Sequence, residues 1–208
     1  MSCPNATPAA PIRCPWVDLA KPDYVRYHDV EWGVPLRDSR LLFELLILEG
    51  IQAGLSWYTV LRKREHYRAV CDGFDPGMVA QYGDDKIEAL LLDSGIIRNR
   101  AKVSAMIENA RRYLVAQVEI GSFAEHLWRF VGGRPQLRAP RCMQDYRAVS
   151  PESDAMSRDL RRRGFKFVGS TICYAFMQAA GMVNDHAIDC FRREEILSGN
   201  DSREIPER

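Results

Sequence analysis

The chain has 208 residues, of which 46% are hydrophobic and 27% are charged, and its formal net charge is +1. This length allows one domain or two small lobes with a real core, and the composition is that of an ordinary globular protein. No apolar run approaches the roughly 20 residues of a membrane span, and the near-neutral charge argues against a globally basic nucleic-acid binder.

The two ends of the chain are polar. Residues 1–11 are rich in Pro, Ala and Ser and contain no apolar run, so they are expected to form a flexible tail rather than a signal peptide. Residues 193–208 are expected to form a polar C-terminal tail, which leaves 12–192 as a single domain.

The six cysteines have no framework spacing. They are therefore expected to be reduced thiols of a cytoplasmic protein, some of them metal-bound.

The hydrophobic pattern between these tails is helical almost throughout. Asp38 or Ser39 can cap the first long helix, and Ser150-Pro151 is a strong helix start because an N-cap precedes proline at the first helical position. No sustained period-two alternation appears, so an all-α fold is predicted. The expected helices are Arg40–Glu49, Leu55–Val70, a short one from Asp75-Pro76, Asp84–Leu92, Arg98–Val118, Ser122–Val131, Pro151–Arg163, Ser170–Ala180 and Asp185–Arg192.

Cys14 and His28 near the start, and His186 and Cys190 near the end, form a candidate tetrahedral zinc set. His186 and Cys190 are four residues apart, so on a helix they would share one face. Two thiolates and two imidazoles suit zinc, and four protein ligands leave no open position, which is typical of a structural metal rather than of a zinc hydrolase. The alternative is a set of unrelated buried residues, because free cysteine is commonly buried. The spacing alone leaves both interpretations open.

A basic segment precedes the last helices. A helix carrying several arginines ends at Gly164, a short apolar hairpin follows, and Gly169 allows a close backbone approach before a new helix begins at Ser170. Helix N-termini attract phosphate, and Lys166 adds a neutralising charge, so the pattern fits a hairpin that grips a nucleic-acid backbone without reading its sequence. The alternative is a plain helical hairpin with a glycine C-cap.

Longer motifs extend over most of the chain. They are CPW at 14–16, YHDVEWGVP at 27–35, LEGIQAGLSW at 48–57 and RGFKFVG at 163–169. Together they resemble the 3-methyladenine DNA glycosylase I family, a branch of the helix–hairpin–helix DNA glycosylases, from about Pro11 to Arg192. The resemblance implies a helix–hairpin–helix fold and removal of 3-methyladenine from alkylated double-stranded DNA by hydrolysis, without strand cleavage. It also implies one structural zinc that ties the terminal segments together. The implied ligands are Cys14, His28, His186 and Cys190.

One position departs from the superfamily pattern. A catalytic aspartate lies shortly after the hairpin in the superfamily, in a similar Val-Asp-x-His setting, whereas Asn184 occupies that position here with Asp185 beside it. An amide cannot act as a general base or stabilise an oxocarbenium ion by charge. A non-catalytic helix–hairpin–helix DNA-binding protein is therefore the alternative function. A monomer is expected for either.

Glu49 is the expected catalytic residue, through its recognition of the base. It projects from the leucine-rich face of its helix, whereas Glu44 lies near Arg37 and Arg40 and is expected to be their solvated partner. A carboxylate in an apolar environment is costly unless it is paired, and the resemblance implies that Glu49 accepts hydrogen bonds from the flipped base. Aromatic residues would stack on that base, although packing in a helical core is the ordinary use of such residues. The aromatic candidates are Trp16, Tyr24, Tyr27, Trp32 and Trp57.

The remaining candidates would contact DNA outside the base pocket. Gly54-Leu55 lies between two expected helices and could fill the gap left by an extruded nucleotide. The resemblance supports this use, and a connecting turn with a buried leucine is an equally simple account. Lys166, Gly169 and Ser170 are the expected backbone contacts of the hairpin.

Overall fold

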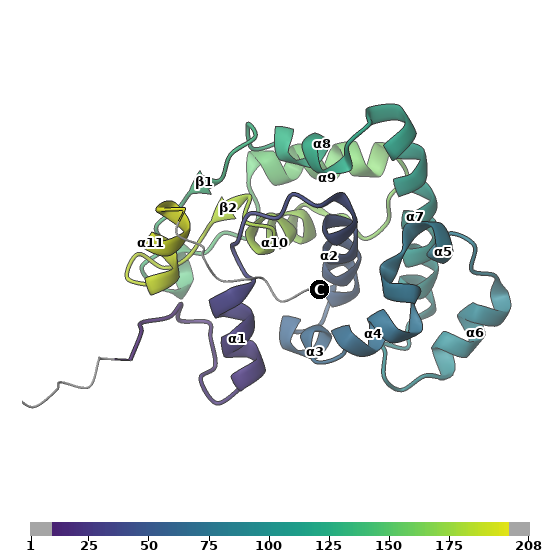
Figure 1. The fold of residues 1–208 in the computed structure, drawn as a ribbon, viewed down its shortest axis with the longest axis horizontal. Helices are drawn as coiled ribbons and strands as arrows, with labels where there is room; N and C mark the ends of the chain where they lie inside the picture. The colour runs from purple at the N-terminus through teal and green to yellow at the C-terminus, as the bar shows by residue number, and fades with distance from the viewer. Residues whose placement is uncertain (1–9, 200–208) are drawn as a thin grey trace, which may run out of the picture.

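The computed structural model describes residues 10–199, and within this range the protein is a body of packed helices with a single pair of very short strands (Figure 1). The prediction of a helical protein is therefore confirmed. The α-helices are α1 (Pro22–Val30), α2 (Ser39–Gln52), α3 (Trp57–Leu61), α4 (Arg64–Val70), α5 (Pro76–Val79), α6 (Asp84–Leu92), α7 (Arg100–Ile120), α8 (Phe123–Arg129), α9 (Pro151–Arg162), α10 (Ser170–Ala179) and α11 (Phe191–Leu197). Two 3-10 turns, η1 (Asp72–Phe74) and η2 (Met143–Asp145), lie between them.

Helix α2 lies in the middle of the molecule (Figure 1). It begins at an Asp38 cap, whose carboxylate accepts hydrogen bonds from the backbone N–H groups of Arg40 and Leu41, as the sequence predicts. Every residue from Leu42 to Ile51 is buried. A helix buried on all sides is a core element, and here it carries two acidic residues, Glu44 and Glu49, into the interior.

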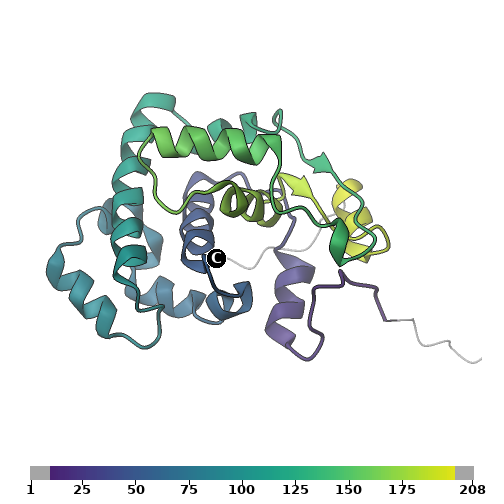
Figure 2. The ribbon, with the colours of Figure 1, turned by 180° about the vertical axis from the view of Figure 1, so that it is seen from behind.

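The basic hairpin connects two helices that pack against each other. Helix α9 starts at Ser150, which shares reciprocal hydrogen bonds with Ser153, and it ends before Gly164. The chain then turns through the hairpin, residues 163–169, and α10 begins at Ser170 (Figure 2). The long helix α7 runs beside the hairpin and starts at an Asn99 cap.

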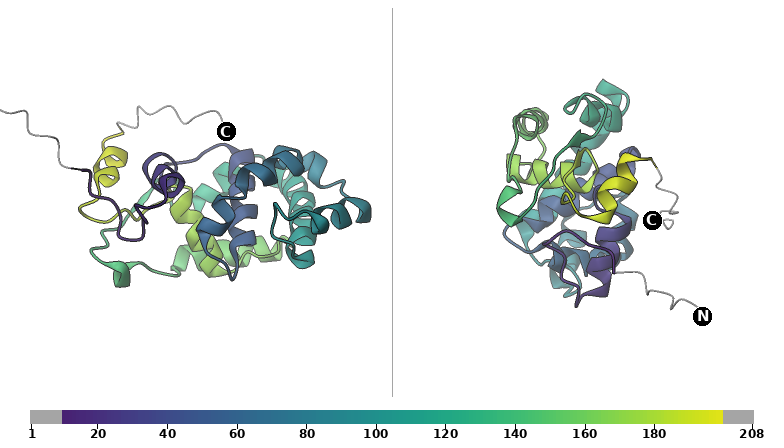
Figure 3. Two further views of the ribbon diagram at one scale, coloured as in Figure 1. Left: turned by 90° about the horizontal axis from the view of Figure 1, so that it is seen from below. Right: turned by 90° about the vertical axis from the view of Figure 1, so that its left-hand side faces the viewer.

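The two ends of the described chain meet on one side of the molecule. Helices α1 and α11 face the same side (Figure 3, right). The backbone N–H of Phe191 donates to the carbonyl of Ile12, which joins the two segments directly. Near them, β1 (Gln136–Leu137) pairs in parallel with β2 (Val183–Asn184).

Several expected elements differ from the structure. The helix predicted from Leu55 to Val70 is divided into α3 and α4, and β1 and β2 form where no strand was expected. The helix predicted over Asp185–Arg192 is wrong, because helical structure begins only at Phe191. It continues to Leu197, so the tail predicted from residue 193 starts with a helix. Residues 1–9 and 200–208 of the predicted tails lie outside the described residues. Within the described part, no helix combines the length and apolarity needed to cross a bilayer.

Candidate functional site

A cavity of about 230 Å³ lies between α1, α2, α3 and α10. Glu49 and all five aromatic residues proposed from the sequence line it, although they come from three separate stretches of chain. The structure also places six residues there that the sequence analysis did not single out. They are Gln52, Met143, Tyr146, Arg147, Ala175 and Gln178.

The missed residues differ in how visible they were in the sequence. Gln52 lies three positions after Glu49 on the same helix, so helical spacing alone could have placed it beside Glu49. Met143, Tyr146 and Arg147 belong to an irregular segment around η2, where no periodic pattern indicates which side chains face the interior. Their position depends on tertiary packing.

Glu49 is buried, with only 4% of its surface exposed. Its Oε2 atom has no hydrogen-bond partner among the described residues, and the same is true of the indole Nε1 of Trp57. Burial raises the pKa of Glu49 to about 8, because the charged form loses its hydration. The cavity wall thus presents an unpaired acceptor and an unpaired donor, an arrangement typical of a site that waits for a polar ligand.

The aromatic side chains contact one another around the cavity. The ring centroids of Trp16 and Trp32 are 4.9 Å apart in an edge-to-face arrangement. Tyr27 lies between Trp57, at 5.4 Å, and Tyr24, at 6.4 Å. Such contacts hold the rings in place before a ligand arrives, so a flat aromatic ligand would meet a preformed wall.

Asn184, the residue that departs from the superfamily pattern, is fully buried in β2 and is not part of the cavity wall. Its side chain accepts a hydrogen bond from the N–H of His186 and donates to the carbonyl of Arg193. Asp185 accepts hydrogen bonds from the hydroxyl of Tyr174, at 3.0 Å, and from the amide of Gln178, at 2.7 Å. Because Gln178 lines the cavity, Asp185 supports its wall from behind.

The four metal candidates converge at the junction of the two ends. Cys14, His28, His186 and Cys190 are all buried, and one ligand atom from each lies within 4.8 Å of the others. His186 and Cys190 do not share a helix face. They belong to a turn in which the N–H of Ala187 bonds to the Cys14 sulfur and the N–H of Ile188 bonds to the carbonyl of Pro140. The cluster could hold a metal ion.

The surroundings of this cluster orient both imidazoles. The Nδ1 atom of His28 lies 2.8 Å from a carboxylate oxygen of Asp29, and the Nε2 atom of His186 lies 3.1 Å from the carbonyl of Trp32. Each ring therefore turns its other nitrogen toward the sulfurs. In metal sites, hydrogen bonds of this kind to the outer nitrogen orient the histidine ligands. The thiol of Cys14 donates to the sulfur of Cys190, which lowers the pKa of Cys190 and raises that of Cys14.

Glycine is required beside the metal candidates. Gly33 has a φ of +81°, and a Cβ atom there would lie 2.7 Å from Nε2 of His186. A side chain at this position would therefore be strained and would displace an imidazole of the cluster.

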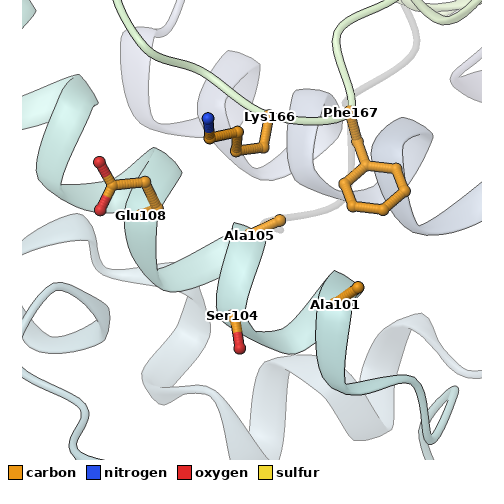
Figure 4. Close-up of a pocket in the computed structure, with 6 residues that line it drawn as sticks. All are labelled: Ala101, Ser104, Ala105, Glu108, Lys166 and Phe167. Atoms are coloured by element: carbon orange, nitrogen blue, oxygen red, sulfur yellow. The ribbon is translucent and has the colours of Figure 1, made fainter.

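The proposed DNA-contacting residues lie in two places: Gly54, Leu55 and Lys166 are exposed, whereas Gly169 and Ser170 are half-buried. Leu55 is 39% exposed and follows Gly54, whose φ is +76°. In the hairpin, Gly169 precedes α10 without a side-chain cap, and a guanidinium nitrogen of Arg161 lies 3.3 Å from where a Cβ of Gly169 would be. A groove of about 420 Å³ separates the hairpin from α7. Figure 4 shows Lys166 and Phe167 of the hairpin above Ala101, Ala105 and Glu108 of α7.

Known proteins match nearly all of this framework. The methyladenine glycosylase family matches residues 16–193. DNA-3-methyladenine glycosylase 1 of Escherichia coli (strain K12) is 51% identical over 178 residues, which cover 86% of this chain and 95% of that protein. A crystal structure of 3-methyladenine DNA glycosylase I has a TM-score of 0.85 at 52% identity, covering 86% of this chain and 98% of that one. A second structure of such an enzyme, in complex with 3-methyladenine, has a TM-score of 0.81 at 38% identity, covering 83% of this chain and 93% of that one. The chain described here belongs to the methyladenine glycosylase family.

Proposed function

We propose that this chain is a DNA glycosylase that turns 3-methyladenine out of alkylated double-stranded DNA and removes it by hydrolysis, acting as a monomer without cleaving the strand. The observation that carries the proposal is the unpaired, buried carboxyl of Glu49 in a cavity walled by aromatic rings. A solved relative of the same family binds 3-methyladenine.

The charge of the lesion suits this cavity. Adenine alkylated at N3 is cationic within the nucleotide, whereas ordinary adenine is neutral. A cation next to Glu49 favours the ionised carboxylate and reverses the effect of burial on its pKa. The aromatic faces of Trp16, Tyr24 and Trp57 add cation–π attraction. The cavity therefore selects the damaged base by its charge as well as by its shape.

Stacking can offset the work of extrusion. Taking a base out of the duplex costs a few kcal/mol, while each aromatic stack returns about 1–3 kcal/mol. Two good stacks would roughly balance the cost. The remaining selectivity then comes from Glu49 and from the unpaired indole N–H of Trp57, which can bond to the edge of the base.

The same charge explains why no aspartate is needed at position 184. A cationic purine is an activated leaving group, because cleavage of the C1′–N9 bond neutralises it. Water then attacks C1′, and recognition supplies most of the catalysis. The burial of Asn184 outside the cavity fits this account, since its side chain serves the β2 turn rather than the reaction.

Two elements supply the DNA contacts. The hairpin acts as a helix–hairpin–helix element, and the turn at Gly54-Leu55 acts as a wedge. The N-terminus of α10, with Gly169, Ser170 and the nearby Arg161 guanidinium, fits a phosphate group. Lys166 adds an exposed positive charge. Leu55 is apolar and exposed at the tip of its turn, so it can occupy the space that the extruded base leaves.

The metal cluster is proposed to hold one structural Zn²⁺. With Zn–S of about 2.3 Å and Zn–N of about 2.0 Å, tetrahedral coordination separates sulfur from nitrogen by about 3.5 Å. Three such pairs in the cluster are 3.4, 3.4 and 3.5 Å apart. Zinc bound by Cys14, His28, His186 and Cys190 would fix the N-terminal segment, which carries Trp16, to the turn before α11.

The decisive test is release of the free base. The purified protein is incubated with methylated duplex DNA, and the released bases are identified by mass spectrometry. Free 3-methyladenine is expected in excess over adenine. Binding of the same DNA without any released base would instead support a non-catalytic DNA-binding protein.

A further inference from the structure

Two buried polar side chains lie on the same face of α7. Lys102 is 8% exposed and Asn109 is 3% exposed, and both are separate from the base cavity. They are seven residues apart, which is close to two helical turns, so their side chains project in nearly the same direction. Each one bonds to the backbone of a different DNA-contacting element.

Lys102 holds the C-terminal end of α2. Its ammonium donates to the carbonyl oxygens of Ile51, at 2.7 Å, and of Ala53, at 2.6 Å. Carbonyls at a helix C-terminus have lost their intrahelical partners and carry partial negative charge, so a buried cation suits them. Ala53 is followed at once by Gly54 and the exposed Leu55. Lys102 therefore fixes the base of the wedge turn.

Asn109 holds the hairpin. Its amide donates to the carbonyl of Lys166 at 3.0 Å and accepts the N–H of the same residue at 2.7 Å. The next residue, Phe167, has a φ of +52°, a conformation that costs energy for a residue with a side chain. A two-point bond to the preceding residue keeps the hairpin in this shape.

The C-terminal part of α2, which leads into the wedge turn, also contacts the hairpin directly. A Cβ atom on Gly50 would lie 3.2 Å from the Cβ of Phe167. Residues of α2, α7 and the hairpin surround a residual space of only about 10 Å³, so this junction is closely packed. The three elements form one unit, and Figure 4 shows the hairpin side of it above α7.

We propose that Lys102 and Asn109 are positioning residues that set the distance between the wedge turn and the hairpin. This inference rests on the proposed function. Extrusion requires that the hairpin hold the DNA strand while the wedge turn enters the base stack. A small error in the spacing of these two elements would therefore slow excision strongly. Because neither residue lines the cavity, they act on extrusion and not on recognition of the extruded base.

The test compares Lys102→Met with Lys86→Met, the same substitution on α6 at a lysine that lines neither the cavity nor the groove beside the hairpin. Three quantities are measured: excision from methylated duplex, excision from methylated single strands, and binding of free 3-methyladenine, followed by the fluorescence of the cavity tryptophans. Lys102→Met is expected to slow duplex excision by at least about tenfold. Single-strand excision and base affinity should change by less than about threefold, since neither requires the wedge. Lys86→Met should match the wild type in all three.

Other outcomes separate the inference from the proposed function. An equal loss on duplex and single strands, a parallel loss of base affinity, or no loss on duplex would each overturn the inference. Wild-type protein that releases no 3-methyladenine would instead overturn the proposed function. In that case, the fluorescence of 2-aminopurine placed beside the lesion still measures how far each protein unstacks the bases. If Lys102→Met unstacks them as much as the wild type does, the inference is overturned. If Lys102→Met does not fold, Lys102→Gln keeps one donor and should give an intermediate loss.

Discussion

Glu49 combines two properties that rarely occur together in a protein interior. It is buried on a helix whose other inward residues are apolar except for Glu44, and one of its oxygens has no partner among the described residues. An arrangement of this kind lowers stability, so it is retained where a ligand completes it. Glu44 provides the contrast. It was expected to be solvated beside Arg37 and Arg40, but it is buried and bonds to Arg68 at 2.6 Å.

Glu49→Gln should separate excision from DNA binding. The amide keeps the size of the side chain and removes its charge, so the extruded cation loses its counter-charge while the hairpin contacts stay intact. Excision should fall by about 100-fold or more, and duplex affinity should change by less than about threefold. Single-turnover excision and fluorescence anisotropy measure the two quantities. Equal loss of both would contradict the role of Glu49 in base recognition.

The raised pKa of Glu49 also predicts how stability depends on pH. The unfolded chain ionises this group above about 4.5, whereas the folded protein keeps the proton up to about pH 8. Unfolding therefore releases a proton between these values, and rising pH favours the unfolded state. From pH 5 to 8 the wild type should lose on the order of 3 kcal/mol of stability relative to Glu49→Gln. Urea denaturation of both proteins at the two pH values measures this difference, and parallel stability curves would disprove it.

At the scale of elements, local signals predicted several helix starts, but they missed α1 entirely and wrongly made the turn before α11 helical. Asp38 and Ser150 cap their helices as their sequence context predicts. The stretch from Asp185 to Cys190 has helical spacing, but the N–H of Ala187 bonds to the Cys14 sulfur and the N–H of Ile188 bonds to the carbonyl of Pro140. Long-range partners of this kind leave no local trace in the sequence. The same holds for η2, whose neighbours Tyr146 and Arg147 reach the cavity from an irregular segment.

The metal cluster predicts a large effect of metal loss on the terminal elements. Without the ion, only hydrogen bonds would hold the two sulfurs and two imidazoles together, so the link between the N-terminal segment and the turn before α11 would be weakened. Chelation, or Cys190→Ser, should lower the unfolding midpoint by about 10 °C or more. Metal analysis should find one zinc per chain in the wild type and in Cys142→Ser, a matched control at an exposed cysteine. Unchanged zinc content in Cys190→Ser would contradict the proposed ligand set.

At the scale of the whole molecule, the cavity is an assembly of distant segments. Its walls come from the N-terminal segment, the central helix α2, the start of α3, the irregular stretch near η2 and helix α10. The N-terminal wall also touches the metal cluster, because the rings of Trp16 and His28 are 5.3 Å apart. Packing of the two described ends is thus coupled to the shape of the cavity.

The residues that line the cavity indicate that the DNA strand stays intact after the base is removed. Strand cleavage by a glycosylase requires an amine that attacks C1′ and forms a Schiff base. None of the described residues that line the cavity is a lysine, and the ammonium of the buried Lys102 is held by two carbonyl oxygens. Water is therefore the expected nucleophile. The product should be an abasic site in an unbroken strand, seen by denaturing electrophoresis before alkaline treatment, and borohydride should trap no protein–DNA adduct. A trapped adduct would show that an amine reaches the sugar and that the hydrolytic account is wrong.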